Sequence, residues 1–546
     1  MRIEKLKYLR MKKNVTIRNF LAISILCFTV VSCKKTLEVA PYNSFTDVTA
    51  FTSPARIESA MNGVYDAAQS GFYAGGQVRG YPFGAANVQQ GDMRGEDMLN
   101  QALFYQITYE ATYNSTSANQ EFMFNTLYAL INRCNLVIKG VSDAVGKNVI
   151  SAALGNQYLA ECRFLRAMAH HELVINYARP YSDGNGSKLG IIYRDFAVAS
   201  DEEVEAAKAL TRKTVAENYT KILEDLDYAE TNLPVTIQNP TGGSEKTFRT
   251  SKAAAIAIKM RVKLHKGDWA GVIAEGNKLV PAGSGPYVSP IGGWKLMANP
   301  GDAFISPWNS DESIFSIRNA STDNAGVNAA LANMLGTPAN SGRGLVRISP
   351  IIFNLPQWRC DDKRRNLLVA YTSAGTTNYL TTKYKDVATS TDAAPQIRYA
   401  EVLLMLSEAE ARNDAGISTR ALDLLNAVRN RSLANPATQQ YVLLDFPSKN
   451  NLISAILVER RIEFLSEGKR WGDIHRLATD ATFGTAGIPA KIGTGVATTA
   501  MYSCGAGGTT YTTIVPAIPY ADFRFIWPIP LSETQQNANY TQNPNY

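Results

Sequence analysis

Histidine is scarce in this sequence, and its few copies are poorly placed to hold a metal ion. The chain carries 4 histidines in 546 residues. No His-Glu-x-x-His motif occurs, and His170 and His171 are neighbours on a predicted helix rather than one turn apart. The sequence therefore predicts neither a metal site nor a cofactor.

Cysteine is also scarce, and its spacing excludes the common zinc-binding and redox motifs. The 6 cysteines include no Cys-x-x-Cys pair. Two of them, Cys27 and Cys33, belong to an N-terminal leader. The other four are Cys134, Cys162, Cys360 and Cys504. The first two fall within helical patterns and are expected to be buried thiols. An exported protein can form disulfides, but the sequence leaves the pairing of these four open.

Beyond its first 35 residues the chain lacks an excess of either charge. The formal net charge is +7, but the basic excess is concentrated before residue 36, where Glu4 is the only acid. The remainder is close to neutral. Because proteins that bind nucleic acid carry a basic patch or stripe, the composition gives no indication of a nucleic-acid partner.

After the leader, no apolar run is long enough to cross a membrane. The leader has a basic segment beginning at Met11 and an apolar run, FLAISILCFTVVSC, from Phe20 to Cys33. This length and these flanks are typical of a secretory signal rather than of a spanning helix. The run ends in Val-Val-Ser-Cys, which resembles a lipoprotein lipobox.

We therefore predict a signal peptide over residues 1–32, cleavage before Cys33 and acylation of its thiol, with membrane attachment through lipid alone. A plain secretory signal with an incidental cysteine is the alternative. Translation can start at Met1 or at Met11, because residues 1–10 are unnecessary for export. Residues 33–53 are predicted to form a lipidated tether, and residues 54–546 a single domain.

Helical periodicity dominates that domain. Apolar residues recur every three or four positions near 54–70 and at 118–140. Further helices are predicted at 151–177, 212–232, 252–266, 268–280, 397–413, 418–432 and 450–466. Short links such as Lys266-Gly267-Asp268 carry the capping chemistry of an antiparallel helical hairpin.

Helix pairs of this size stack into arrays, because one pair cannot bury its apolar face alone. Four pairs are predicted: 151–177 with 212–232, 252–266 with 268–280, 397–413 with 418–432, and 450–466 with 469–477. No strict repeat period joins them. We expect a mainly α fold of four tetratricopeptide-like helix pairs.

Three long segments interrupt the helices, near 71–117, 282–396 and 478–530. They are rich in Gly, Pro, Thr, Asn and aromatic residues, with short strand-like pieces such as ESIFSIRNA. Loops of this length in a compact protein are usually functional. The helices are therefore expected to form the scaffold and the insertions the working surface.

Several stretches together resemble one family, the SusD/RagB outer-membrane lipoproteins. They are AECRFLRAMAHHELVINYARP at 160–180, RTSKAAAIAIKMRVKLHKGDW at 249–269, RYAEVLLMLSEAEARNDAG at 398–416, ALDLLNAVRNR at 421–431, ERRIEFLSEGKRWGDIHR from 459, and WPIPLSETQQNANYTQNPNY at 527–546. The occurrence of all these stretches in this order is specific to that family. Together with the lipobox they span nearly the whole mature chain. The chain departs from the family pattern in two small ways. Ser407 stands before the Glu-Ala where alanine is commoner, and the chain ends in Asn-Pro-Asn-Tyr rather than the more usual Asn-Pro-Gly-Tyr.

The resemblance implies a single SusD-like helical domain with irregular insertions and a non-catalytic binding role at the cell surface. Family members lie over a TonB-dependent transporter resembling SusC and pass it oligosaccharides, or peptides in the RagB branch. The expected partners are such a transporter, a glycan and the membrane at the lipid anchor. Lys34 and Lys35, rather than an acidic run, follow Cys33, so outer-membrane anchoring is better supported than exposure to the exterior.

One group of carboxylates raises the question of an active site. Glu459, Glu463 and Glu467 recur every four residues in ERRIEFLSEGKRW. Arginines interleave with them, so each carboxylate has a cation at helical spacing and is expected to stay ionised. We interpret this stretch as ion-paired scaffold, with Trp471 in packing or in a cation–π contact.

A second group, Glu401, Glu408 and Glu410, could suggest the paired carboxylates of a glycosidase. The other face of their helix is apolar, so solvated or ion-paired carboxylates explain them better. The sequence has no nucleophile elbow or metal motif. No enzymatic activity is predicted.

Sugar recognition needs aromatic faces for the C–H side of a pyranose, and polar side chains for its hydroxyls. The first and middle insertions offer both. The predicted aromatic platform is Tyr73, Tyr81, Trp294 and Trp308, and the predicted polar anchors are Asn87, Asp92 and Arg94. The resemblance places the family's ligand site in the same two regions, the loop after the first helix and the middle insertion.

The predicted function is therefore capture of an oligosaccharide by a lipid-anchored outer-membrane protein that passes it to a SusC-like transporter. A RagB-like peptide binder is the first alternative, and the sequence leaves it open. A hydrolase lacks a credible catalytic group here. A purely structural helical-repeat adaptor would need fewer aromatic-rich insertions.

Overall fold

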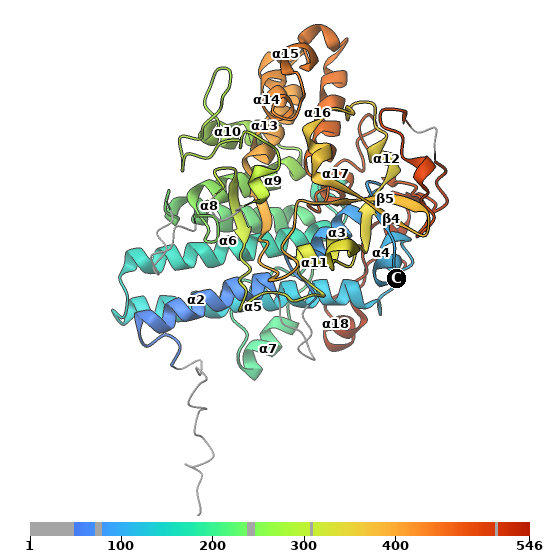
Figure 1. Ribbon diagram of the computed structural model, residues 1–546. Coiled ribbons are helices and arrows are strands. Elements are labelled where there is room, and N and C mark those ends of the chain that lie inside the picture. The colour runs from blue at the N-terminus through green and yellow to red at the C-terminus, as the bar shows by residue number, and fades with distance from the viewer. Residues whose placement is uncertain (1–48, 71–78, 237–245, 306–309, 508–510) are drawn as a thin grey trace, which may run out of the picture.

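The computed structural model describes residues 49–70, 79–236, 246–305, 310–507 and 511–546, and its main feature is an array of helices (Figure 1). The long helices are α2 (Pro54–Gln69), α5 (Ala118–Gly146), α6 (Ala152–Tyr177), α8 (Val215–Asn232), α9 (Lys252–Lys266), α10 (Trp269–Leu279), α13 (Tyr399–Asn413), α14 (Thr419–Asn430) and α16 (Lys449–Glu463). Each predicted helix is confirmed, with its ends displaced by a few residues.

Local capping explains where several of these helices begin. Thr214 and Glu217 form a reciprocal capping box at the start of α8. Between α9 and α10, Gly267 adopts φ +75°, which closes one helix, and the Asp268 side chain accepts from the backbone N–H of Gly271, which opens the next. The predicted hairpin at Lys266-Gly267-Asp268 is therefore confirmed.

The helices pack largely in chain order. Helix α2 packs on α5, α5 on α6, α6 on α8, α8 on α9, α9 on α10, α10 on α13, and α13 on both α14 and α16. In Figure 1, α2, α5 and α6 lie side by side at one end, and α13, α14 and α16 at the other. The fourth predicted pair is different: α17 (Arg470–Arg476) packs mainly on α3 (Ala85–Met93).

The insertions contribute short antiparallel strand pairs. Strand β1 (Met98–Asn100) pairs with β3 (Val346–Ile348), and β2 (Ser313–Ile317) with β6 (Ala394–Arg398). Strand β4 (Leu368–Ser373) pairs with β5 (Thr376–Thr381), and β7 (Gly487–Ile488) with β8 (Ile518–Pro519). The remaining short helices are α4 (Gln106–Tyr109), α7 (Asp201–Lys208), α11 (Leu331–Leu335), α12 (Pro350–Phe353), α15 (Pro436–Gln439) and α18 (Leu531–Gln536). Because β1 and β3 come from different insertions, the strands join segments far apart in sequence.

The cysteines resolve the question that the sequence left open. Cys134 and Cys162 are buried free thiols, as predicted. Cys360 and Cys504 form a disulfide with a Cα–Cα distance of 5.7 Å. It links the middle insertion to the last one. Among the described residues, no helix has the length and apolar character needed to span a membrane.

A buried ion-pair network fastens the middle insertion to α16. Its acids are Asp362, Glu312, Glu459, Glu463 and Glu467, and its bases are Arg364, Arg398, Arg429, Arg431 and Lys383. Burial alone would raise the pKa of Glu463, but Arg431, Arg398 and Arg364 hold it well below its ordinary value. The scaffold interpretation of residues 459–477 agrees with this arrangement.

The partners in this network were predicted wrongly. Glu463 and Glu467 pair with cations from other elements, Arg431 and Arg398 among them, and not with the arginines beside them in sequence. Arg460 instead pairs with Asp473. Glu467 lies beyond the end of α16, so it does not share a helix face with the other two glutamates.

Candidate functional site

The polar face of α2 lines a groove on the protein surface. Ile57, Met61, Val64 and Ala68 are buried against the core. The adjacent face presents Glu58, Asn62, Tyr65, Asp66 and Gln69, which recur at helical spacing. All five line the groove. One amphipathic helix therefore supplies both core packing and a row of polar groups.

The opposite side of the groove comes from the middle insertion. It begins at Ile317, the last residue of β2, and continues through a tight turn in which Ala320 and Asp323 exchange backbone hydrogen bonds of 2.8 and 3.0 Å. Gln69 joins the two sides. Its Nε2 donates to the carbonyls of Arg318 at 2.8 Å and Asp323 at 3.1 Å. The groove therefore lies where the first helix meets the middle insertion.

The floor of the groove is held by a charged cluster. Arg249 donates to Glu58 at 2.6 Å and to Glu161 at 2.7 and 3.0 Å. The hydroxyl of Tyr65 donates to Glu161 at 2.6 Å. Because these contacts are charge-assisted and partly buried, they keep the floor rigid.

The aromatic rings of the groove are covered rather than open. The Arg249 guanidinium lies 5.2 Å from the centre of the Tyr65 ring, and that of Arg318 lies 5.7 Å from the centre of the Phe248 ring. Phe248 is buried. Most side chains that line the groove nevertheless carry a hydrogen-bonding group, and stacking on an open ring is not its dominant chemistry.

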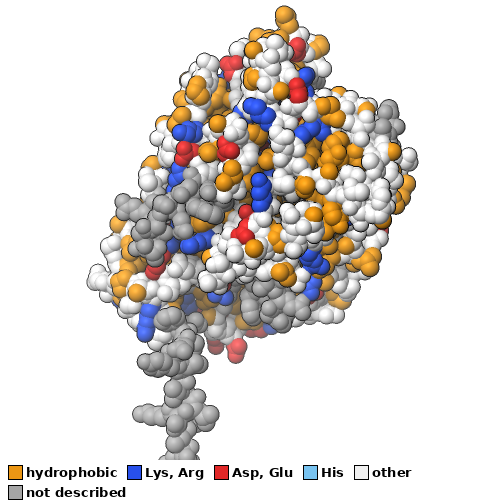
Figure 2. Space-filling model, viewed as in Figure 1, with side chains coloured by type: hydrophobic (Ala, Val, Ile, Leu, Met, Phe, Trp, Pro, Cys, Tyr) orange, Lys and Arg blue, Asp and Glu red, His pale blue; other side chains and the backbone are white. Residues whose placement is uncertain are grey.

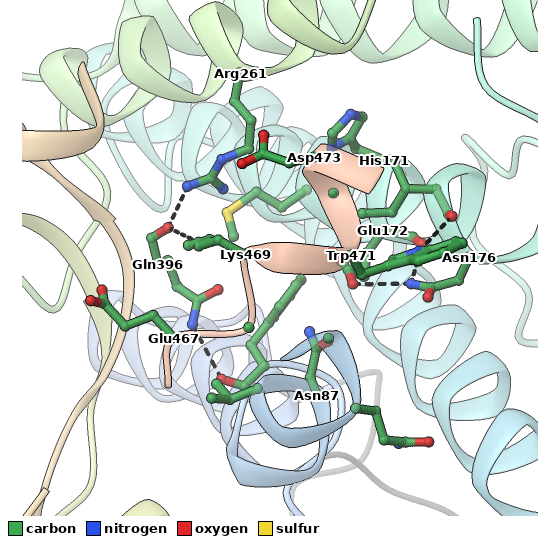
Figure 3. Close-up of a pocket in the computed structure, with 18 of the residues that line it drawn as sticks. Asn87, His171, Glu172, Asn176, Arg261, Gln396, Glu467, Lys469, Trp471 and Asp473 are labelled. Carbon is green, nitrogen blue, oxygen red and sulfur yellow. Dashed lines mark hydrogen bonds between the residues drawn. The ribbon is translucent and has the colours of Figure 1, made fainter. Parts of the chain in front are cut away.

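A second hollow lies inside the protein, between α3, α6, α9 and α17 (Figure 3). Lys469 and Gln396 lie on one side of it, and Glu172 with Asn176 on another. The Lys469 ammonium donates to the Gln396 carbonyl at 2.9 Å, and Asn176 donates to the Glu172 carboxylate at 3.0 Å. Burial, followed by the nearby Arg261, lowers the pKa of Lys469 to about 8. Several of its polar groups are thus paired with one another.

Size distinguishes these two hollows. Ligand pockets generally enclose roughly 300–1,000 Å³. The groove beside α2 has a volume of about 380 Å³, whereas the internal cavity has about 80 Å³. The cavity has room for several water molecules. By volume, the groove falls within the range of ligand pockets and the cavity does not.

A third depression of about 320 Å³ lies beside the start of α8. Tyr193, Leu210 and Lys221 are among its lining residues. It is formed by none of the insertions predicted to bind a ligand.

The structure places the predicted aromatic platform as follows. Tyr73 and Trp308 lie outside the described residues, as does the predicted lipidation site, Cys33. Tyr81 and Trp294 are only 1% and 3% exposed. The Tyr81 hydroxyl accepts from Gln90, and Lys246 lies 5.2 Å from the centre of the Trp294 ring. Neither ring is available for stacking, because core packing encloses both.

The predicted polar anchors are also drawn inward. Arg94 is 1% exposed and lies between the rings of Trp471 and Trp527, at 3.2 and 4.6 Å from their centres. The cation–π partner of Trp471 is therefore Arg94. Asp92 is buried and accepts from the backbone N–H of Gly468 at 3.1 Å. These residues hold α3 to the C-terminal part of the chain.

Of the predicted anchors, Asn87 lines the internal cavity, and Asp92 lines a separate hollow of about 10 Å³. The groove beside α2 is lined by none of Tyr81, Asn87, Asp92, Arg94 and Trp294. Asn62, Asp66 and Gln69 line the groove but were not predicted as site residues. Their signal was present in the polar positions that alternate with the apolar face of the first helix.

The second group of glutamates is ion-paired. Glu401 pairs with Arg261 at 2.7 Å, and Glu408 with Arg476 at 2.7 Å. Burial opposes the charge of Glu401, but Arg261 and Lys469 lower its pKa to about 2. The expectation of ion-paired carboxylates is confirmed, although Glu401 and Glu408 are buried rather than solvated.

Two family models match long parts of this chain. The model described as "SusD family" matches residues 362–546, and the model described as "Starch-binding associating with outer membrane" matches residues 35–264. The chain belongs to the SusD family. The SusD-like proteins P38 and P2 of Formosa agariphila are 24% and 25% identical to it. Each alignment covers 85% of this chain, and they cover 91% of P38 and 92% of P2.

Solved structures agree with this SusD-like fold. A SusD superfamily protein from Bacteroides fragilis superposes with a TM-score of 0.71 at 26% identity, over 90% of this chain and all of that one. Surface glycan-binding protein A from Bacteroides uniformis gives a TM-score of 0.66 at 17% identity, over 90% of this chain and 99% of its own. At that identity the second likeness concerns the fold alone. The predicted mainly α, SusD-like fold is confirmed.

Proposed function

We propose that this SusD-family protein is a non-enzymatic binding protein that captures an oligosaccharide in the groove beside α2. The observation that carries the proposal is the position of the groove, because Gln69 joins the end of the first helix to the middle insertion there. Its volume and polar lining suit a ligand rich in hydroxyls. The family-model description, starch-binding and associated with the outer membrane, supports a carbohydrate ligand.

Binding in this groove rests on hydrogen bonds from a rigid wall. The side chains of Asn62 and Asp66 project from a helix whose other face is fixed in the core. Sugar hydroxyls can donate to and accept from such groups. Because each contact replaces a contact with water, modest affinity is expected.

The test is calorimetric titration of the chain from residue 36 onward with panels of neutral and charged oligosaccharides and of mixed peptides. Asn62→Trp is the blocking variant, because it adds bulk at an exposed groove position without altering the buried face. We expect heat with one glycan class and its loss in the variant. Binding of peptides alone would favour the RagB-like alternative, and glycan binding that survives Asn62→Trp would place the site elsewhere.

The remaining parts of the proposal concern location and partner. We infer cleavage before Cys33, acylation of that thiol and attachment to the outer membrane, with the domain facing the exterior. The Cys360–Cys504 disulfide supports export, because such bonds persist in oxidising compartments. Incorporation of labelled palmitate that Cys33→Ser abolishes, and removal of the domain from whole cells by added protease, would test these points.

The proposed partner is a SusC-like TonB-dependent transporter that receives the bound glycan. The family relationship supports it. Affinity purification of the tagged lipoprotein from detergent-solubilised outer membranes tests it directly. An outer-membrane barrel protein should co-purify in equal amount, and its absence under mild detergent would contradict the partnership.

A further inference from the structure

The groove beside α2 carries charges of both signs, but its best-placed cation is already neutralised. Arg249 is shared between Glu58 and Glu161, with contacts between 2.6 and 3.0 Å. Its guanidinium also faces the Tyr65 ring. A ligand carboxylate or sulfate would have to displace Glu58 and the buried Glu161 to reach it. Arg249 is therefore a structural group rather than an anion receptor.

Two carboxylates of the groove are in the opposite situation. Within the described part of the chain, neither Asp66 nor Asp323 has a side-chain hydrogen bond or an ion pair. Both side chains are exposed at the groove. The pKa of Asp66 is raised, first by partial removal of its hydration and second by the charge of Asp323, while Arg133 acts in the opposite direction. The two carboxylates are thus close enough to influence each other.

Gln69 adds a third acceptor to the same place. It is 6% exposed, and its Nε2 is fixed by the carbonyls of Arg318 and Asp323. This network determines the orientation of the amide, so Oε1 is directed away from those carbonyls. In the described structure Oε1 has no hydrogen-bond partner. A buried acceptor without a partner costs stability, and a bound donor would relieve that cost.

Arg318 is the other cation that lines the groove. Its guanidinium lies over the Phe248 ring at 5.7 Å, at the edge of the groove. The lining therefore has three acids, Glu58, Asp66 and Asp323, and two arginines, of which Arg249 is held by Glu58 and Glu161. The excess acceptor capacity lies on Asp66, Asp323 and Gln69. On the face in Figure 2, acidic and basic side chains are interspersed among uncharged ones.

We propose that the groove selects glycans whose hydroxyl or amino groups donate hydrogen bonds to Asp66, Asp323 and Gln69, and that it rejects glycans rich in carboxylate or sulfate. This inference rests on the function proposed above. Hydrogen bonds to ionised acceptors are among the strongest in proteins. Bringing a uronate or sulfate beside two carboxylates is unfavourable, and such like-charge contacts are a common source of specificity.

The experiment compares neutral, amino-bearing and anionic probes on one protein. Maltohexaose, cellohexaose and xylohexaose represent neutral glycans, chitosan oligosaccharides carry amino groups, and oligogalacturonate and heparin oligosaccharides are anionic. The chain from residue 36 onward is titrated with each at low salt. We expect at least one neutral or amino-bearing probe to bind at least tenfold more tightly than either anionic probe.

The double variant Asp66→Asn, Asp323→Asn tests the cause of this selectivity, and Asp195→Asn in the third depression is its matched control. All three aspartates are exposed, so the folded state should persist, which thermal unfolding checks. We expect the double variant to bind the neutral or amino-bearing probe at least tenfold more weakly and to lose most of its discrimination against the anionic probes. The control should match the wild type.

The outcomes separate the two proposals. A wild-type preference for an anionic probe, lost in Asn62→Trp, would overturn the selectivity and leave the groove as the glycan site. Unchanged binding in the double aspartate variant would also overturn it. Binding of a glycan that Asn62→Trp does not affect, or binding of no glycan at all, would overturn both proposals.

Discussion

Arg398 holds Glu467 through two hydrogen bonds, from Nε at 2.9 Å and from Nη2 at 2.8 Å, although 69 residues separate them. Arg398 ends strand β6 in the middle insertion, and Glu467 follows helix α16. The side chains of Arg398 and Glu467 are only 2% and 1% exposed. This pair connects the insertion that forms one side of the groove to the helical array.

Replacing Arg398 with Met should therefore destabilise the whole domain. The substitution leaves Glu467 and Glu463 buried with fewer cations, and breaking a buried pair in this way costs about 3–5 kcal/mol. Urea unfolding followed by circular dichroism measures the change. The control is Arg359→Met, whose partner Asp361 is 43% exposed, and its effect should stay below about 1 kcal/mol. Equal effects of the two substitutions would contradict this account.

Acid should weaken the fold before most carboxylates titrate. All four histidines are buried, and burial is the first cause that lowers the pKa of each, to about 3 for His171 and His475. Between pH 6.5 and 3 the unfolded chain binds protons that the folded chain does not. The free energy of unfolding must then fall as the pH falls, by up to about 1.4 kcal/mol per pH unit for each histidine.

Asp92 acts in the opposite direction. Burial raises its pKa to about 7, so the stability that it contributes is present at low pH and is lost as the pH rises through 7. Urea unfolding at several values between pH 7.5 and 5 gives the net slope. We expect the histidines to dominate, and His171→Phe to flatten the slope. An unchanged slope in that variant would show that His171 is protonated in the folded state.

The disulfide predicts a defined thiol count. Protein from residue 36 onward should react with two equivalents of Ellman's reagent in denaturant, from Cys134 and Cys162, and with four after reduction. Reduction, or the double variant Cys360→Ser, Cys504→Ser, should lower the free energy of unfolding by about 2–4 kcal/mol, because the bond closes a long loop. Four reactive thiols without reductant would contradict the pairing.

Arg94 should affect stability rather than ligand affinity. It lies between Trp471 and Trp527, donates to Asn176 at 2.8 Å and donates to the Phe525 carbonyl at 2.8 Å. Arg94→Ala removes these contacts, and we expect a loss of about 2–4 kcal/mol in urea unfolding. Glycan affinity of the folded protein should stay within twofold of wild type. A selective loss of binding would restore Arg94 as a ligand contact.

Periodicity in the sequence determined the helices. Apolar residues at three- and four-residue spacing located α2, α5, α6 and the later helices, because a helix must bury one continuous face whatever its neighbours are. The capping residues Gly267 and Asp268 located the turn between α9 and α10, because capping involves only the backbone of the adjacent helix ends. These features depend on contacts within a few residues, so sequence alone was sufficient for them.

Only the tertiary structure decided the partners of the buried charges and the exposure of the aromatic rings. Glu467 could have paired with any nearby arginine, and contact with Arg398 follows from the position of β6. Tyr81 and Trp294 have the composition of a sugar platform, yet long-range packing encloses them. Conversely, Asp66 and Asp323 become neighbours because Gln69 fixes the middle insertion beside α2. Such choices depend on residues that lie from 69 to 254 positions apart, which no local pattern in the sequence records.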